Sequence, residues 1–140
     1  MDRENSMQNS TLDKESIAAL TAAVGTSYVQ GGIKRTVLQK TNFPDGFTVN
    51  FNIIEVPNGT SASPHTHPGL EITYVLEGDF DLVTKGKPDQ RFKPGMSYMV
   101  TDSDVHFARV LGDKPIKLLC VFINAQNKPV ATVVGSPETR

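Results

Sequence analysis

Three histidines and one glutamate stand at spacings that can hold a metal ion. His65 and His67 are two residues apart, and Glu71 follows four residues after His67. Side chains at i and i+2 of an extended segment point to the same side, and a carboxylate at a further even offset can join them. The remaining histidine of the chain, His106, lies in a second strand-like run, 105–110. Three imidazoles and one carboxylate can therefore meet at one point.

Such a ligand set suits one divalent transition metal ion. Neutral imidazoles with a carboxylate accept iron, manganese, zinc, nickel or copper, and the general order of affinities does not select among them. A single histidine is more often a surface or hydrogen-bonded core residue, but the whole constellation favours metal binding. Four protein ligands leave two positions open on an octahedral ion, which is typical of a catalytic metal, whereas a closed tetrahedral zinc would be structural.

Two glycines bracket these residues and complete a familiar pattern. The order is Gly59, five residues, His65, one residue, His67, three residues, Glu71, six residues, Gly78. This spacing resembles the first motif of the cupin family without a mismatch.

The second cupin motif is matched in part. It runs glycine, five residues, proline, one residue, glycine, two residues, histidine, three residues, asparagine. Gly95 and His106 occupy the glycine and histidine positions, while Thr101, Ser103 and Val110 replace the proline, inner glycine and asparagine. The resemblance covers residues 34–124 and implies a small antiparallel barrel that binds a metal through the four ligands above. It implies no substrate, because one fold hosts many functions.

Hydrophobic alternation also predicts an all-β fold. Segments 34–40 and 47–56 are strand-like, and further short strands are expected at 71–77, 80–84, 90–92, 97–100, 105–110 and 116–123, with glycine and proline between them. In 47–56 the apolar residues alternate with polar ones, which predicts that the apolar face belongs to the core; these apolar residues are Phe47, Val49, Phe51 and Ile53. Pattern and resemblance together predict a cupin-type double-stranded β-helix, a jelly-roll barrel.

The two ends of the chain differ from this barrel. Residues 11–24 are rich in alanine, with Ser10 or Thr11 as a candidate N-cap and Gly25 as a stop, and we expect a short amphipathic helix there. We therefore divide the chain into an N-terminal tail and helix, 1–33, the cupin barrel, 34–124, and a C-terminal tail, 125–140, with an edge strand at 130–134.

Composition excludes several classes of partner. The length of 140 residues fits one domain with a core of its own, and 14 basic against 15 acidic residues give a net charge of −1. This balance indicates no binding of nucleic acid or of a membrane surface, and no run reaches the roughly 20 apolar residues of a membrane span. The single cysteine, Cys120, is compatible with a reducing compartment, and we expect the cytoplasm.

Other residues give weaker signals. Glu77 lies at an even offset from Glu71, so it is expected to share the inward face and is a candidate general acid or base, although a solvated strand end is the simpler interpretation. Tyr98 and Arg109 could contact a substrate but are more simply outer-face strand residues. Cys120 is expected to be a buried, inert thiol. No motif indicates an organic cofactor.

Two functions remain open at this stage. One is a metal-dependent enzyme that binds a small molecule, with dioxygenase or isomerase-like chemistry. The other is a non-catalytic cupin module that binds a metal or a small ligand. A homodimer is expected in either case, formed through the outer face of the barrel or through the N-terminal segment, because short strands leave sheet edges to be covered.

Overall fold

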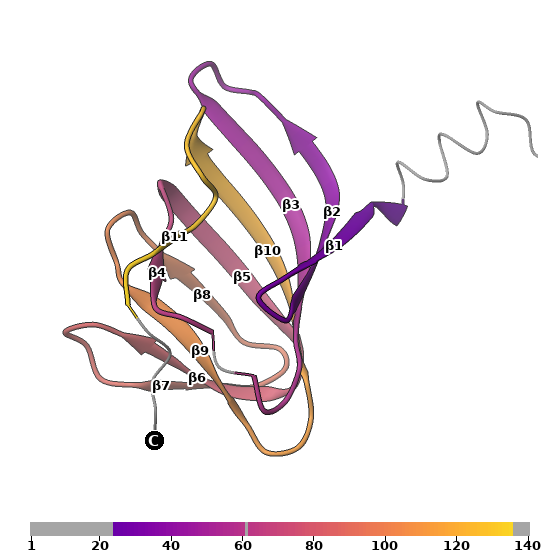
Figure 1. The fold of residues 1–140 in the computed structure, drawn as a ribbon, viewed down its shortest axis with the longest axis vertical. Helices are drawn as coiled ribbons and strands as arrows, with labels where there is room; N and C mark the ends of the chain where they lie inside the picture. The colour runs from indigo at the N-terminus through magenta and orange to yellow at the C-terminus, as the bar shows by residue number, and fades with distance from the viewer. Residues whose placement is uncertain (1–23, 61, 136–140) are drawn as a thin grey trace, which may run out of the picture.

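The computed structural model describes residues 24–60 and 62–135, which form two antiparallel sheets facing each other (Figure 1). The strands of this described part are β1 (Thr26–Gln30), β2 (Ile33–Thr41), β3 (Phe47–Val56), β4 (His65–Thr66), β5 (Gly69–Glu77), β6 (Asp79–Thr84), β7 (Gln90–Phe92), β8 (Ser97–Val100), β9 (His106–Leu111), β10 (Ile116–Ala125) and β11 (Thr132–Val133). The all-β prediction is confirmed. The helix expected over 11–24 lies outside the described residues, except for Val24. Within the described residues, no helix is long and apolar enough to cross a membrane.

The strand order brings distant parts of the chain together. One sheet has the order β1-β2-β3-β10-β5-β8, and the other has the order β11-β4-β9-β6-β7. The short strand β4 therefore pairs with β9, although about forty residues separate them in the sequence. The predicted segments from 34 to 123 all fall on observed strands, whereas β1 and β4 were not predicted.

An apolar core fills the space between the two sheets. Phe80, Val75 and Ile116 have no exposed surface, and Phe80 stacks on Phe92 with ring centroids 5.7 Å apart. Phe122, from β10, lies farther along the same interior and contacts the ring of His67 at 5.0 Å. The barrel thus has a closed apolar end and an end where histidines meet the core.

The predicted orientation of β3 is wrong. Its buried face carries Asn50, Asn52, Ile54 and Val56, while Phe47 is 43% exposed and the residues between are only half-buried. Asn52 lies opposite Cys120 on β10, so the inward row of this strand faces the polar part of the interior. The outer face of β3 is apolar, and part of its inner face is polar because it borders a polar site. The polarity of the residues alone therefore does not predict which face of this strand points inward.

Gly78, between β5 and β6, permits a tight turn against β10. Its φ of +84° lies in the left-handed region, and a Cβ there would stand 2.5 Å from the carbonyl oxygen of Pro115. Both features require glycine. Gly78, the last glycine of the first motif, therefore has a steric role at the turn between β5 and β6.

Gly78→Ala should lower the free energy of unfolding by about 2 kcal/mol or more, because backbone strain and overlap with a neighbouring strand add together. Gly86→Ala is the matched control. Its φ is +81°, but nothing lies within 4 Å of the added Cβ, so only the strain of about 1 kcal/mol applies. Urea denaturation of both variants measures the difference. Equal losses would show that the close approach to Pro115 is not a constraint.

Candidate metal centre

The three histidines come from two neighbouring strands of one sheet, and the glutamate comes from the other sheet. His65 on β4 lies opposite His106 on β9, and His67 follows β4 directly. Glu71 projects inward from β5 and is 5% exposed. One ligand atom from each of the three rings lies within 4.8 Å of the others. The three rings therefore lie close together, and that they bind a metal with Glu71 stays a prediction.

Each imidazole is oriented by a backbone carbonyl. Nδ1 of His65 donates to Ser63 O at 2.8 Å, and Nδ1 of His67 donates to Val130 O at 2.7 Å. Nδ1 of His106 donates to Asp104 O at 2.9 Å. A carbonyl oxygen only accepts, so each Nδ1 carries a hydrogen, and in the neutral ring Nε2 keeps its lone pair. In metal sites, a hydrogen bond from the ring nitrogen that does not bind the metal orients the histidine in this way.

The turn before His106 keeps its shape without the glycine of the family pattern. Ser103 takes φ +71°, which is the left-handed region that a glycine would occupy. The turn is closed by the amide of Asp104, which donates to Thr101 O at 3.2 Å, and by the Thr101 hydroxyl, which donates to the Asp104 carboxylate at 3.2 Å. The backbone carbonyl of Asp104 accepts the Nδ1 hydrogen of His106, so the turn positions the ring directly.

Glu71 is the negative centre of the site. Its Oε1 lies 3.0 Å from His67 Nε2 and 3.4 Å from His106 Nε2. Burial by itself would raise the pKa of Glu71, but the hydrogen bonds from His106 and His67 outweigh it and hold the pKa below the usual range. The carboxylate is therefore ionised inside the barrel.

The imidazole pKa values respond to the same charge. Burial lowers the pKa of His65 to about 4, so this ring is neutral at neutral pH. Burial would also lower the pKa of His106, but the hydrogen bond to Glu71 and the attraction of its charge raise it. His106 Nε2 lies 3.4 Å from Glu71 Oε1 and has no other polar partner among the described residues.

These observations fit a metal ion. An ionised carboxylate inside the barrel is costly unless positive charge compensates it. The three Nε2 atoms and the Glu71 carboxylate are the donor types that transition metals accept. His65, His67, Glu71 and His106 are therefore the residues that could hold one.

A polar row behind Glu71 fixes the carboxylate. The Thr73 hydroxyl donates to Glu71 Oε2 at 2.7 Å and lies 3.2 Å from the Cys120 sulfur. Tyr98 lies opposite Thr73 on β8, and burial raises the pKa of its phenol well above the usual value, with the charge of Glu71 adding to the rise. Sequence reasoning placed Tyr98 on the outer face, which is wrong. Tyr98 lies two residues before the apolar Val100, and this spacing could have predicted that both side chains point inward.

The site opens into a cavity and a vestibule. The inner cavity has a volume of about 50 Å³, and the four candidate ligands line it together with Tyr98 and Cys120. An adjoining vestibule of about 370 Å³ lies between the β1–β2 hairpin and the segment 129–133. Four residues line both spaces, namely Ile33, Arg35, Ala62 and His65. A small molecule can therefore approach the histidines from this side.

The remaining predicted residues lie away from the site. Glu77 is exposed at the end of β5 opposite Lys117, where a β-bulge interrupts the register, so its expected inward orientation is wrong. Arg109 points outward and pairs with Asp81 at 3.8 Å and Asp89 at 3.0 Å, as expected for an outer-face residue. Sequence reasoning missed Arg35, although it alternates with Ile33 on one face of β2.

The sequence also matches a known family over half its length. The pattern of the cupin domain matches residues 52–122, which include the four candidate ligands. This chain is a cupin. The fold of this cupin agrees with solved structures. The polyketide cyclase RemF from Streptomyces resistomycificus superposes with a TM-score of 0.64 at 18% identity, covering 84% of this chain and 85% of that one. Oxalate decarboxylase from Lactobacillus farciminis gives 0.61 at 20% identity, covering 78% and 33%.

A curated relative gives a further likeness in sequence. L-ectoine synthase from Vibrio campbellii is 27% identical to this cupin over 78 residues, which are 56% of this chain and 61% of the relative. This cupin therefore matches only about three fifths of that enzyme's length.

Cys120 should be unreactive in the folded protein. It is 1% exposed, and burial raises the pKa of its thiol well above the usual value, so the thiolate that attacks alkylating reagents does not form at moderate pH. Iodoacetamide at pH 8.5 should label no thiol in native protein and one thiol after denaturation, as measured by intact mass. Rapid labelling of native protein would show that solvent reaches the row behind Glu71.

Proposed function

We propose that this cupin is a metal-dependent enzyme that acts on a small molecule inside the barrel. His65, His67, Glu71 and His106 hold one divalent transition metal ion in this proposal. The observation that carries it is the set of three Nδ1 hydrogen bonds to backbone carbonyls, together with the approach of two Nε2 atoms to within 3.0 and 3.4 Å of the buried Glu71 carboxylate. The proposal includes the cytoplasm as its compartment, since the one thiol is buried and needs no oxidising partner.

A catalytic role is favoured over simple storage of a metal. A bound metal would act as a Lewis acid toward a substrate oxygen. The chain's own contribution is to hold Glu71 ionised through Thr73, to orient the rings and to surround the substrate with apolar walls. The vestibule supplies access, which a purely structural ion does not need.

Two reaction classes fit this site. Dioxygenase chemistry and isomerase-like proton transfer both use a metal with open positions. The relatives in sequence and fold are named for a synthase, a cyclase and a decarboxylase. None of these three names is that of a dioxygenase, so we favour the reaction class that does not deliver dioxygen. Turnover of diols, phenols or small carboxylic acids by metal-loaded protein without dioxygen would support this choice, whereas turnover that requires dioxygen uptake would favour the dioxygenase. Tight metal binding without any turnover of the panel would leave the non-catalytic module.

We also propose a homodimer formed through the outer face of the six-stranded sheet. Phe51, Val121, Ile72 and Met99 form one apolar row across β3, β10, β5 and β8. Ile72 is 43% exposed and Met99 is 61% exposed. Contiguous apolar rows on an open sheet face favour packing against another sheet. A second copy offers the same face, as a two-fold interface requires.

Loss of any one inner ligand should remove the metal. His65→Ala and His106→Ala should each weaken metal affinity by more than about 100-fold, which is the upper range for residues that only support ligands. Glu71→Gln should also weaken metal affinity. Glu77→Gln is its matched control, because the same change is made six residues along β5 at an exposed side chain. Metal analysis after dialysis measures occupancy. Full occupancy in both histidine variants would refute the ligand assignment.

A charge in the apolar row should dissociate the dimer. Met99→Asp places a carboxylate in the proposed interface, and the protein should sediment as a monomer at concentrations where the wild type is dimeric. Val133→Asp is the control, since Val133 is 65% exposed but belongs to an edge strand of the other sheet. A dimer that survives Met99→Asp would place the interface elsewhere, such as the N-terminal segment.

A further inference from the structure

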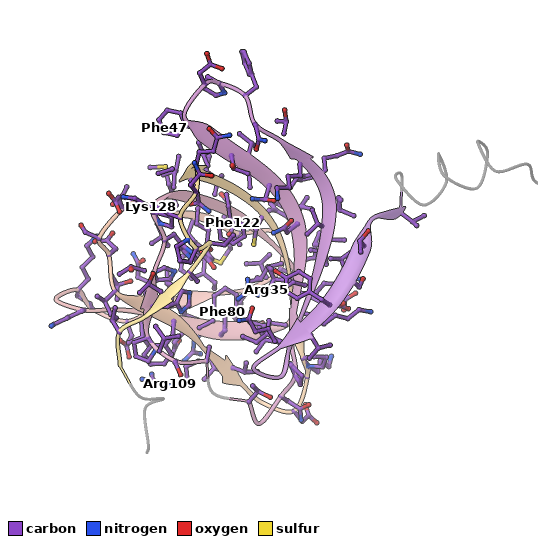
Figure 2. The ribbon with its side chains drawn as sticks, turned by 45° about the horizontal axis from the view of Figure 1, so that its top comes forward. Arg35, Phe47, Phe80, Arg109, Phe122 and Lys128 are labelled. Atoms are coloured by element: carbon purple, nitrogen blue, oxygen red, sulfur yellow. The ribbon has the colours of Figure 1, made fainter. Side chains whose placement is uncertain are left out.

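Arg35 projects into the interior of the barrel from β2. It lies opposite Ile54, which is 5% exposed on the inward face of β3, and paired residues of antiparallel strands share a face. Figure 2 shows Arg35 within the outline of the barrel, whereas Phe47 and Arg109 lie at its periphery. Burial raises the pKa of Cys120, and the positive charge of Arg35 is one of the effects that oppose this rise. Arg35 also lines the inner cavity together with Glu71 and Cys120, so its guanidinium charge acts there.

No carboxylate within the described residues pairs with this guanidinium. The preceding residue, Lys34, turns outward and lies 3.7 Å from Glu55, but no described carboxylate lies within 4 Å of Arg35. A guanidinium stays charged at every working pH and offers five hydrogen-bond donors in a planar fork. A half-buried charge without a partner is unfavourable for folding alone. A bound ligand with a hydrogen-bond acceptor for the guanidinium would explain why Arg35 lies in the interior.

The charges around the two spaces favour an anion. Among the described residues that line the inner cavity, Arg35 is the only arginine or lysine and Glu71 is the only carboxylate. In the vestibule, Arg35 is the only described lining residue of either kind. Glu71 is already held by Thr73, His67 and His106. The carboxylate and the guanidinium balance each other, so a divalent ion would leave its whole charge uncompensated. An anionic substrate would reduce that charge.

We propose that Arg35 is a specificity residue that binds the carboxylate of a small organic acid. The carboxylate matches the planar fork of one arginine. The body of the acid lies against apolar walls that include Ile54, Leu82 and Leu118, and its remaining polar atoms face the histidines. The inference deepens the proposed function by naming its substrate class, but the contact between Arg35 and a carboxylate does not itself require a metal.

A carboxylate fits better than a phosphate. Phosphate sites usually combine several cations with backbone amides at a glycine-rich loop or a helix N-terminus. The described walls of the cavity and vestibule supply one arginine, no lysine and no helix. The inner space is also small and mainly apolar, which suits a short acyl chain with one charged end.

The test compares butyrate with butyramide, which has nearly the same shape but no charge. Calorimetric titration of full-length, metal-free protein should show saturable binding of butyrate and binding of butyramide that is about ten- to hundredfold weaker, as expected for charge-assisted hydrogen bonds. Arg35→Gln should weaken butyrate binding by the same factor and leave butyramide unchanged. Lys34→Gln is the matched control, because it removes a positive charge from the same strand on its outer face.

Arg35→Lys guards against a loss that reflects misfolding, since it keeps the charge but not the fork and should bind butyrate with intermediate affinity. Equal affinities for the two probes, unchanged butyrate affinity in Arg35→Gln, or no saturable butyrate binding by the wild type would each overturn the inference. Inorganic phosphate that binds more tightly than butyrate would overturn the carboxylate class. Butyrate binding through Arg35 in a protein that takes up no metal would support the inference while the proposed function fails.

Discussion

Three imidazoles, two of them buried, take their orientation from three backbone carbonyls, and the rest of the site depends on this arrangement. Ser63, Val130 and Asp104 each accept an Nδ1 hydrogen, and the other ring nitrogens of His67 and His106 lie 3.0 and 3.4 Å from the Glu71 carboxylate. An ionised carboxylate in a medium of low polarity needs positive charge beside it. The raised pKa of His106 and the lowered pKa of Glu71 both express that need for positive charge.

The fold serves this arrangement by joining segments that are distant in the chain. Asp104 belongs to the turn before β9, while Val130 belongs to the C-terminal segment that closes the vestibule. Glu71 reaches the same point from the opposite sheet and is held there by Thr73. Each ligand therefore has its own support on a different element. A cupin barrel can then vary the walls of the vestibule, including Arg35, without moving the rings.

The sequence could indicate that the candidate ligands lie close together, because most of their spacing is a local property. His65, His67 and Glu71 share one stretch, and the second motif located His106 even though Ser103 replaces its inner glycine. Orientation was harder to predict. On β3 the apolar residues were assigned to the core, yet Asn50 and Asn52 face inward, because the interior is polar beside the site.

Partners across the barrel could not be read from spacing at all. Thr73, Cys120 and Tyr98 form one row only through the pairing of β10, β5 and β8, which depends on long-range register. The inward position of Arg35 likewise follows from its pairing with Ile54. The bulge that leaves Glu77 exposed is a single extra residue in the ladder, and alternation along one strand carries no sign of it.

X-ray absorption spectroscopy at the edge of the bound metal tests the central claim most directly. The account predicts a shell of nitrogen and oxygen scatterers with the multiple-scattering pattern of three imidazoles, reduced to two imidazoles in His106→Ala samples reloaded with metal. Fewer than three imidazoles in the wild type, or a sulfur scatterer from Cys120, would contradict it.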